Sequence, residues 1–225
     1  MPPELTIVDD LAGAFSERVV AAFGARRHDV FCLALCGGST ATLCYRRLAE
    51  VGAASVDWLS VNIYWGDERC VPADDPDSNQ LLGRRELLEK VGAANAVYPM
   101  SCDDGPDAYQ LRIGEIGQLD LVHLGVGPDG HTASLFPDSA ALHADPGQLV
   151  TLNEDPAGRN PHRRMTLTFA GIARARLAVV TVGGASKRDV MEALVAGADL
   201  PAAHIRADEV VWLVDGEAAP RNHRH

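Results

Sequence analysis

The sequence predicts an α/β fold, an open and mainly parallel sheet with helices on both faces. Short β-rich runs alternate with amphipathic stretches along the chain, as strand–helix–strand units require. The run at residues 30–35 is almost continuously apolar and ends at two glycines, as expected of a strand buried on both faces. No repeat, low-complexity tract or linker divides the chain, so residues 1–225 are expected to form a single domain.

Each element follows from a local pattern. Residues 5–8 form the first expected strand, and a helix over 11–26 follows because Leu11, Phe15, Val19 and Phe23 recur every four residues on one face. The other expected strands are 60–65, 97–100, 119–124, 164–169, 177–182 and 210–214. The other expected helices are 40–51, 78–91, 106–116 and 186–195.

Composition excludes several classes of protein. Lys and Arg number 20 against 31 Asp and Glu, a net charge of −11, which disfavours nucleic acid as a partner. The N-terminal residues do not resemble a targeting signal, and the apolar runs are too short to cross a membrane. Five cysteines without CxxC spacing predict reduced thiols in a cytoplasmic protein. Neither a metal nor a cofactor is expected, because the histidines are scattered and no calcium-loop or Walker pattern occurs.

Open α/β sheets bind ligands beyond the carboxyl ends of their strands, so site residues are expected in the loops there. Gly37 and Gly38 end one strand, and Ser39 and Thr40 open the next helix, an arrangement that suits a phosphate. The alternative is a simple turn in which Ser39 or Thr40 caps the helix. The loop at 183–188 repeats the pattern and adds Lys187, which is either a phosphate ligand or a solvent-exposed lysine.

Two further strand ends carry acid–base residues. The loop at 125–131 contains GxGxxG, but Pro128 and Gly130 disfavour the helix that a dinucleotide site needs. It presents Asp129 and His131 instead, a pair suited to general base catalysis. Residues 65–69 place Asp67 and Arg69 near the same edge of the sheet.

These stretches together resemble the glucosamine-6-phosphate isomerase/6-phosphogluconolactonase family over essentially the whole chain. The matching motifs are LCGGST at 35–40, WGDER at 65–69, LGVGPDGHTASLFP at 124–137, RMTLT at 164–168 and GGASK at 183–187. The resemblance implies that the 6-phosphate is bound by Gly38, Ser39, Thr40, Arg164 and Lys187. It also implies a catalytic set of His131, Asp129, Asp67 and Arg69. Arg163 is adjacent to Arg164, and either could be the phosphate ligand.

The lactonase form of the motif implies hydrolysis of 6-phospho-D-glucono-1,5-lactone in the oxidative pentose phosphate pathway, with His131 activating water. Deaminases of the family resemble GxDGHIAFNEP in this stretch, whereas here Phe136 replaces their glutamate. The alternatives are a glucosamine-6-phosphate deaminase or isomerase, and a non-catalytic sugar-phosphate-binding module. The expected partner is a small sugar phosphate, and the chain is expected to be a monomer or small homo-oligomer.

Overall fold

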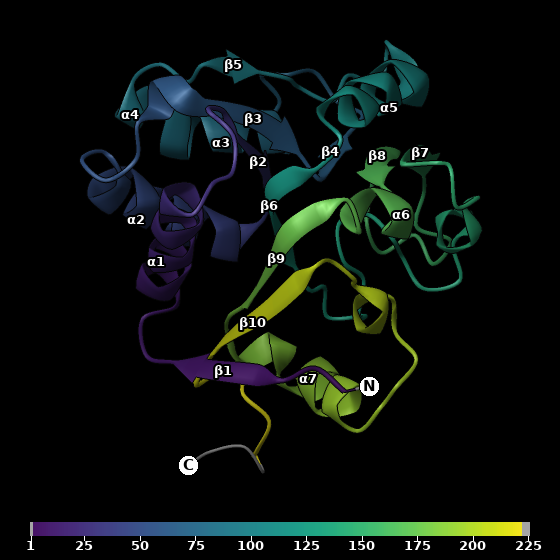
Figure 1. Ribbon diagram of the computed structural model, residues 1–225. Helices are drawn as coiled ribbons and strands as arrows, with labels where there is room; N and C mark the ends of the chain where they lie inside the picture. The colour runs from purple at the N-terminus through teal and green to yellow at the C-terminus, as the bar shows by residue number, and fades with distance from the viewer. Residues whose placement is uncertain (1, 222–225) are drawn as a thin grey trace.

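A computed structural model describes residues 2–221. Its main sheet has seven strands in the order β1-β10-β9-β6-β2-β3-β5, and every neighbouring pair is parallel (Figure 1). The strands are β1 (Leu5–Val8), β2 (Phe31–Leu35), β3 (Val61–Trp65), β5 (Ala96–Val97), β6 (Leu119–Gly125), β9 (Ala175–Val182) and β10 (Glu209–Asp215). The predicted fold class is therefore confirmed.

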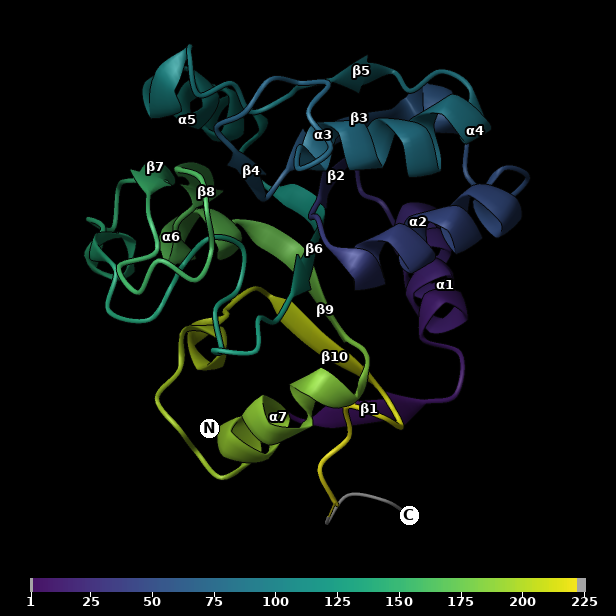
Figure 2. The same cartoon turned by 180° about the vertical axis from the view of Figure 1, so that it is seen from behind.

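Helices cover both faces of this sheet (Figures 1 and 2). One face carries α1 (Leu11–Gly24), α2 (Ser39–Gly52) and α3 (Asn79–Gly83), which continues through a π-helical turn at Arg84–Leu88 into α4 (Glu89–Val91). The other carries α5 (Gly105–Ile116), α6 (Phe169–Ile172) and α7 (Arg188–Val195). The helices change face because the chain runs toward β5 and then back toward β1, while its crossovers stay right-handed. Short 3-10 turns lie at Trp58–Ser60, Ala140–His143, Ala185–Lys187 and Pro201–His204.

The apolar face predicted for the first helix packs into the core. Phe15, Val19 and Phe23 are buried, and the side chain of Asp10 caps the helix by accepting a hydrogen bond from the Gly13 amide at 2.8 Å. No helix in the described part of the chain is both long and apolar enough to cross a membrane.

A second, antiparallel sheet lies beside the first and was not distinguished by the sequence pattern. It contains β4 (Asp67–Arg69), β8 (Arg164–Leu167) and β7 (Val150–Asn153), in that order. Gly66 joins the two sheets, since its amide donates to Leu35 of β2 at 2.8 Å and its carbonyl accepts from Leu167 of β8 at 2.8 Å. A strand as short as β4 has too few residues to show a periodicity.

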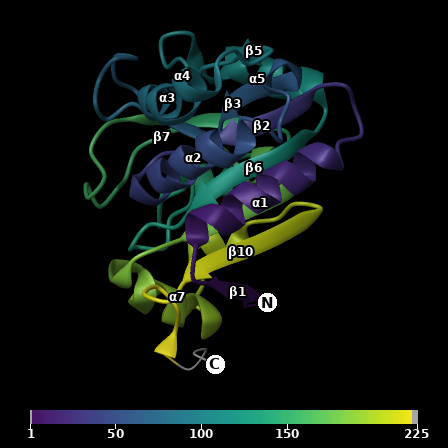
Figure 3. The same cartoon turned by 90° about the vertical axis from the view of Figure 1, so that its left-hand side faces the viewer.

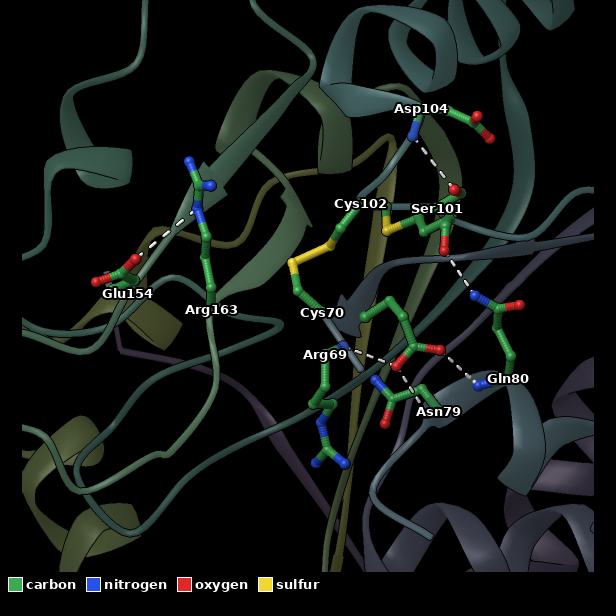
Figure 4. Close-up of a disulfide and its surroundings, with 11 residues drawn as sticks. Arg69, Cys70, Asn79, Gln80, Ser101, Cys102, Asp104, Glu154 and Arg163 are labelled. Atoms are coloured by element: carbon green, nitrogen blue, oxygen red, sulfur yellow. Dashed lines mark hydrogen bonds and ion pairs between the residues drawn. A yellow bond between two sulfur atoms is a disulfide. The ribbon is translucent and has the colours of Figure 1, made fainter. Parts of the chain in front are cut away.

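The cysteine prediction is wrong at two positions, because Cys70 and Cys102 form a disulfide (Figure 4). They are 32 residues apart in sequence, but the end of β4 and the segment after β5 bring their Cα atoms to 5.4 Å. Cys32, Cys36 and Cys44 are free and buried. Burial raises the pKa of Cys32 to about 11 and that of Cys44 to about 12, which keeps both thiols protonated near neutral pH.

Candidate functional site

A cavity of about 270 Å³ lies at the carboxyl ends of β2, β6 and β9 and is bounded on one side by the second sheet. This is the position at which open α/β sheets bind ligands. The cavity is lined by all but one of the nine site residues predicted from sequence, namely Gly38, Ser39, Thr40, Asp67, Arg69, His131, Arg164 and Lys187. The ninth, Asp129, does not line the cavity, and its Oδ1 contacts Nδ1 of His131.

The first glycine loop presents a helix N-terminus to the cavity. Gly38 is the N-cap of α2 with φ of 99°, a conformation that favours glycine, and no side chain caps this helix. The expected alternative, a cap by Ser39 or Thr40, is therefore wrong. Gly37 is needed for another reason, since a Cβ there would lie 1.7 Å from Oδ1 of Asn79. The uncapped first turn can receive an anion.

His131 and Asp129 form a hydrogen-bonded pair. Nδ1 of His131 lies 2.6 Å from Oδ1 of Asp129, which leaves Nε2 as the ring nitrogen available to a ligand. Burial by itself raises the pKa of Asp129, but the hydrogen bond and charge of His131 outweigh it and hold that pKa at about 2. Asp129 is therefore an ionised acceptor, and the exposed Arg159 lies 3.7 Å from its other oxygen.

Two neighbours shape the space around this pair. A Cβ at Gly127 would lie 2.1 Å from Nδ1 of His131, so only glycine leaves room for the ring. The ring of Phe136 is buried and packs edge-on against His131, with centroids 5.0 Å apart. The imidazole is thus oriented by a carboxylate and an aromatic ring.

Asp67 is held by two residues that sequence reasoning missed. The hydroxyl of Ser134 donates to Oδ2 of Asp67 at 2.7 Å. Nδ2 of Asn79 donates to the backbone carbonyl of Asp67 at 2.8 Å and to its Oδ1 at 3.2 Å. Asn79, together with Asn160 and Thr181, also lines the cavity. Ser134 lies inside the recognised motif, but nothing local in the sequence connects Asn79 with Asp67.

The second sheet contributes two adjacent arginines, because Arg69 of β4 is the register partner of Arg164 of β8. Arg164 is buried, and burial followed by the charge of Arg69 lowers its pKa. The Nε atoms of Arg69 and Arg164 are both buried and lack a hydrogen-bond partner in the described part of the chain. Like charges opposite each other are unfavourable unless an anion joins them.

Neighbouring basic residues separate into those that face the cavity and those that do not. Arg164 lines it, whereas Arg163 is exposed and lies 3.8 Å from Glu154. Lys187 lines it as well, whereas Arg188 donates to the carbonyl of Ala219 at 3.3 Å. Burial lowers the pKa of Lys187, and the charge of Asp129 opposes this shift. A small cationic cavity therefore lies in an acidic protein.

A metal site is not found in this region or elsewhere within residues 2–221, where no three His, Cys, Asp or Glu side chains are grouped to hold an ion.

Comparison with known proteins identifies the family. The model of a family described as glucosamine-6-phosphate isomerases/6-phosphogluconolactonase matches residues 4–212. The chain belongs to this family. A 6-phosphogluconolactonase of Mycobacterium tuberculosis is 34% identical over an alignment covering 95% of this chain and 94% of that protein. One of Synechocystis sp. is 36% identical, covering 83% of this chain and 82% of that protein.

Solved structures agree with this membership. The crystal structure of 6-phosphogluconolactonase from Leishmania guyanensis matches with a TM-score of 0.82 and 27% identity, covering 97% of this chain and 98% of that one. The resemblance to lactonases indicated by the motifs is therefore confirmed over nearly the whole chain.

Proposed function

We propose that this protein hydrolyses 6-phospho-D-glucono-1,5-lactone to 6-phospho-D-gluconate in the oxidative pentose phosphate pathway, with His131 as the general base. One observation carries the proposal. The Asp129-oriented ring of His131 shares a cavity of about 270 Å³ with Arg164, Lys187 and the uncapped N-terminus of α2. A base and an anion site so close together suit a phosphorylated substrate with a reactive carbonyl.

In the proposed reaction, Nε2 of His131 takes a proton from a water molecule as the water oxygen attacks C1 of the lactone. The bond between C1 and the ring oxygen then breaks, and the imidazolium returns the proton to the departing oxygen. Asp129 stabilises the imidazolium and fixes the ring through Nδ1. General base catalysis of this kind contributes a factor of about 10²–10⁴.

The carbonyl oxygen gains negative charge during the attack and needs a donor. Three amides of the neighbouring loop already donate within the loop. Gly127 donates to the carbonyl of His131 at 2.8 Å, and Gly130 to that of Gly127 at 2.9 Å. The amide of His131 donates to Asp129 at 3.2 Å. We therefore assign this role to Arg69, whose buried Nε has no partner among the described residues. Asp67 completes the proposed catalytic set and would accept from a substrate hydroxyl.

The 6-phosphate is proposed to bind Gly38, Ser39, Thr40, Arg164 and Lys187. Anchoring this distant group holds C1 next to His131, so binding energy from the phosphate is used for orientation. Burial of Arg164 beside Arg69 supports the assignment, because a dianion relieves the repulsion between the two guanidinium groups.

The deaminase alternative is less well supported. Phe136 stands where deaminases of the family have a glutamate, and its ring is buried against His131. No carboxylate is present at this position to act on an amino sugar. A purely binding module would not need the His131–Asp129 pair.

The experiment that tests the function compares freshly prepared 6-phosphogluconolactone with and without the protein, because this lactone also hydrolyses spontaneously. Product is detected by coupling to 6-phosphogluconate dehydrogenase. We expect a rate well above the spontaneous one. A rate equal to the background would contradict the proposal, and release of ammonia from glucosamine 6-phosphate would favour the deaminase.

Residues of both sheets line the cavity, so we also propose that the chain forms one domain. A monomer or small homo-oligomer, located in the cytoplasm, completes the proposal. The Cys70–Cys102 disulfide is uncommon in a reducing compartment, and its redox state in cells is therefore informative about location.

A further inference from the structure

His123 is a fully buried histidine that the proposed reaction does not use. It belongs to β6, the strand over which α1 and α2 lie in Figure 3. Its ring lies 4.1 Å from that of Phe15 and 5.4 Å from that of Tyr45, measured between centroids. Nδ1 lies 3.0 Å from the hydroxyl of Tyr45, and Nε2 lies 2.8 Å from the hydroxyl of Thr181. Both ring nitrogens are therefore partnered without any contact to solvent.

The hydroxyl of Tyr45 connects this histidine to the first glycine loop. It accepts a hydrogen bond from the amide of Cys36 at 2.7 Å and donates to the carbonyl of the same residue at 3.1 Å. A phenol has one proton and two lone pairs. With the proton given to the carbonyl, the second lone pair accepts from Nδ1 of His123. All three contacts are then satisfied.

With the phenol proton on the Cys36 carbonyl, one tautomer of His123 fits this arrangement. Nδ1 carries the proton, and Nε2 accepts a hydrogen bond from Thr181. Burial holds the pKa of His123 at about 3, so the ring stays neutral throughout the physiological range. The network therefore has a constant hydrogen-bond pattern, as a positioning element needs.

Both ends of the network reach the wall of the cavity. Cys36 directly precedes Gly37 and Gly38, and Thr181 lies two residues before Gly183, which opens the second glycine loop. The strand that carries His123 lies between β2 and β9 in the sheet. One imidazole thus joins the starting points of both loops.

We propose that His123 is a positioning residue that sets the relative placement of the two glycine loops, through Tyr45 on one side and Thr181 on the other. The inference rests on the proposed function in one respect, that these loops bind the substrate phosphate. It adds His123 and Tyr45, neither of which lines the cavity.

The test uses Tyr45→Phe, which removes only the hydroxyl, and His123→Leu, which removes both bonds of the ring. His123→Asn is the conservative variant, because its amide can still donate to Tyr45. Tyr109→Phe is the matched control. The Tyr109 hydroxyl makes the same pair of bonds to the amide and carbonyl of Trp65, at 2.8 and 3.1 Å, at the end of β3.

Each variant is measured in three ways: thermal unfolding, the Kd for 6-phosphogluconate by calorimetry, and the KM and kcat for the lactone. Tyr45→Phe and His123→Leu should raise Kd and KM about fivefold, the equivalent of one neutral hydrogen bond. We expect kcat to change by less than about twofold, since the His131–Asp129 pair is untouched. His123→Asn should recover part of the loss, and Tyr109→Phe should lower stability alone.

Two results would overturn the inference. One is a Kd within about twofold of wild type for both Tyr45→Phe and His123→Leu as folded proteins. The other is an equal loss of affinity in Tyr109→Phe, because the effect would then be a general consequence of lower stability. Binding of 6-phosphogluconate without any turnover by the wild-type protein would sink the proposed function instead, and the Kd values would still decide this inference.

Discussion

Nδ1 of His131 lies 2.6 Å from Oδ1 of Asp129, and the short loop between them leaves no space for any side chain at Gly127. The pair is therefore built by the loop itself, which is held by two backbone hydrogen bonds and by a bond from the His131 amide to the Asp129 carboxylate. Its position at the end of β6 places a base at the cavity wall.

Replacement of the base is the first prediction. His131→Ala should leave the fold intact and lower kcat by about 10²–10⁴, because the proton of the attacking water loses its acceptor. His204→Ala is the matched control, since His204 forms a comparable pair with Asp199 at 2.5 Å on the exposed surface. Steady-state kinetics and thermal unfolding are measured for both. Near-normal turnover in His131→Ala would exclude it as the base.

Gly127→Ala tests the geometry without touching either catalytic group. The added methyl would lie 2.1 Å from Nδ1 of His131 and must displace the ring. We expect kcat to fall at least about tenfold, because the base is moved away from the attacking water. Gly114→Ala, where a Cβ meets no atom within 4 Å, should behave as wild type. Unchanged kcat in Gly127→Ala would show that the position of the ring is not critical.

Substitution of Arg163 and of Arg164 should affect KM differently, although the two residues are neighbours in sequence. Arg164→Ala should raise the KM for the phosphorylated lactone and scarcely affect hydrolysis of unphosphorylated gluconolactone. Lys187→Ala should behave similarly. Arg163→Ala is the control, because Arg163 is exposed beside Glu154. The KM ratio of the two substrates is the measurement, and an equal change for both would remove Arg164 from the phosphate site.

Asp129 should contribute to stability in a defined pH range. Its pKa is lowered from the ordinary 3.8 to about 2, so its contribution is complete above about pH 4 and is lost as the pH falls through 2. Asp129→Asn cannot titrate and lacks this pH dependence. We expect the difference in Tm between wild type and Asp129→Asn to shrink from pH 5 toward pH 2. A difference that is constant over this range would contradict the assigned pKa.

The disulfide should stabilise the fold. Cys70 and Cys102 close a loop with a sequence separation of 32 residues. The chain-entropy model predicts that removing such a link lowers the free energy of unfolding by about 3–4 kcal/mol. Dithiothreitol should therefore lower the Tm of the wild-type protein and leave a Cys70→Ser, Cys102→Ser double variant unchanged. Five free thiols in the unfolded, untreated protein would show that the bond does not form in solution.

Much of the architecture could be predicted because it depends on local patterns. The spacing of Phe15, Val19 and Phe23 predicts a helix wherever it packs, and glycines after an apolar run predict a strand end. The parallel sheet followed from this alternation, and the position of the cavity followed from the sheet. The loop at 125–131 carries Asp129 and His131 within one short stretch of chain, so its chemistry was also recognisable.

The remaining features depend on residues that are far apart in the chain. The change of sheet at Gly66, the support of Asp67 by Asn79, and the Cys70–Cys102 bond all require the order in which strands lie side by side. Only the tertiary structure shows that Arg164 rather than Arg163 faces the cavity, and that His123 joins the two loops. Local periodicity specifies which face of an element is buried, whereas strand order is decided by the packing of the whole chain.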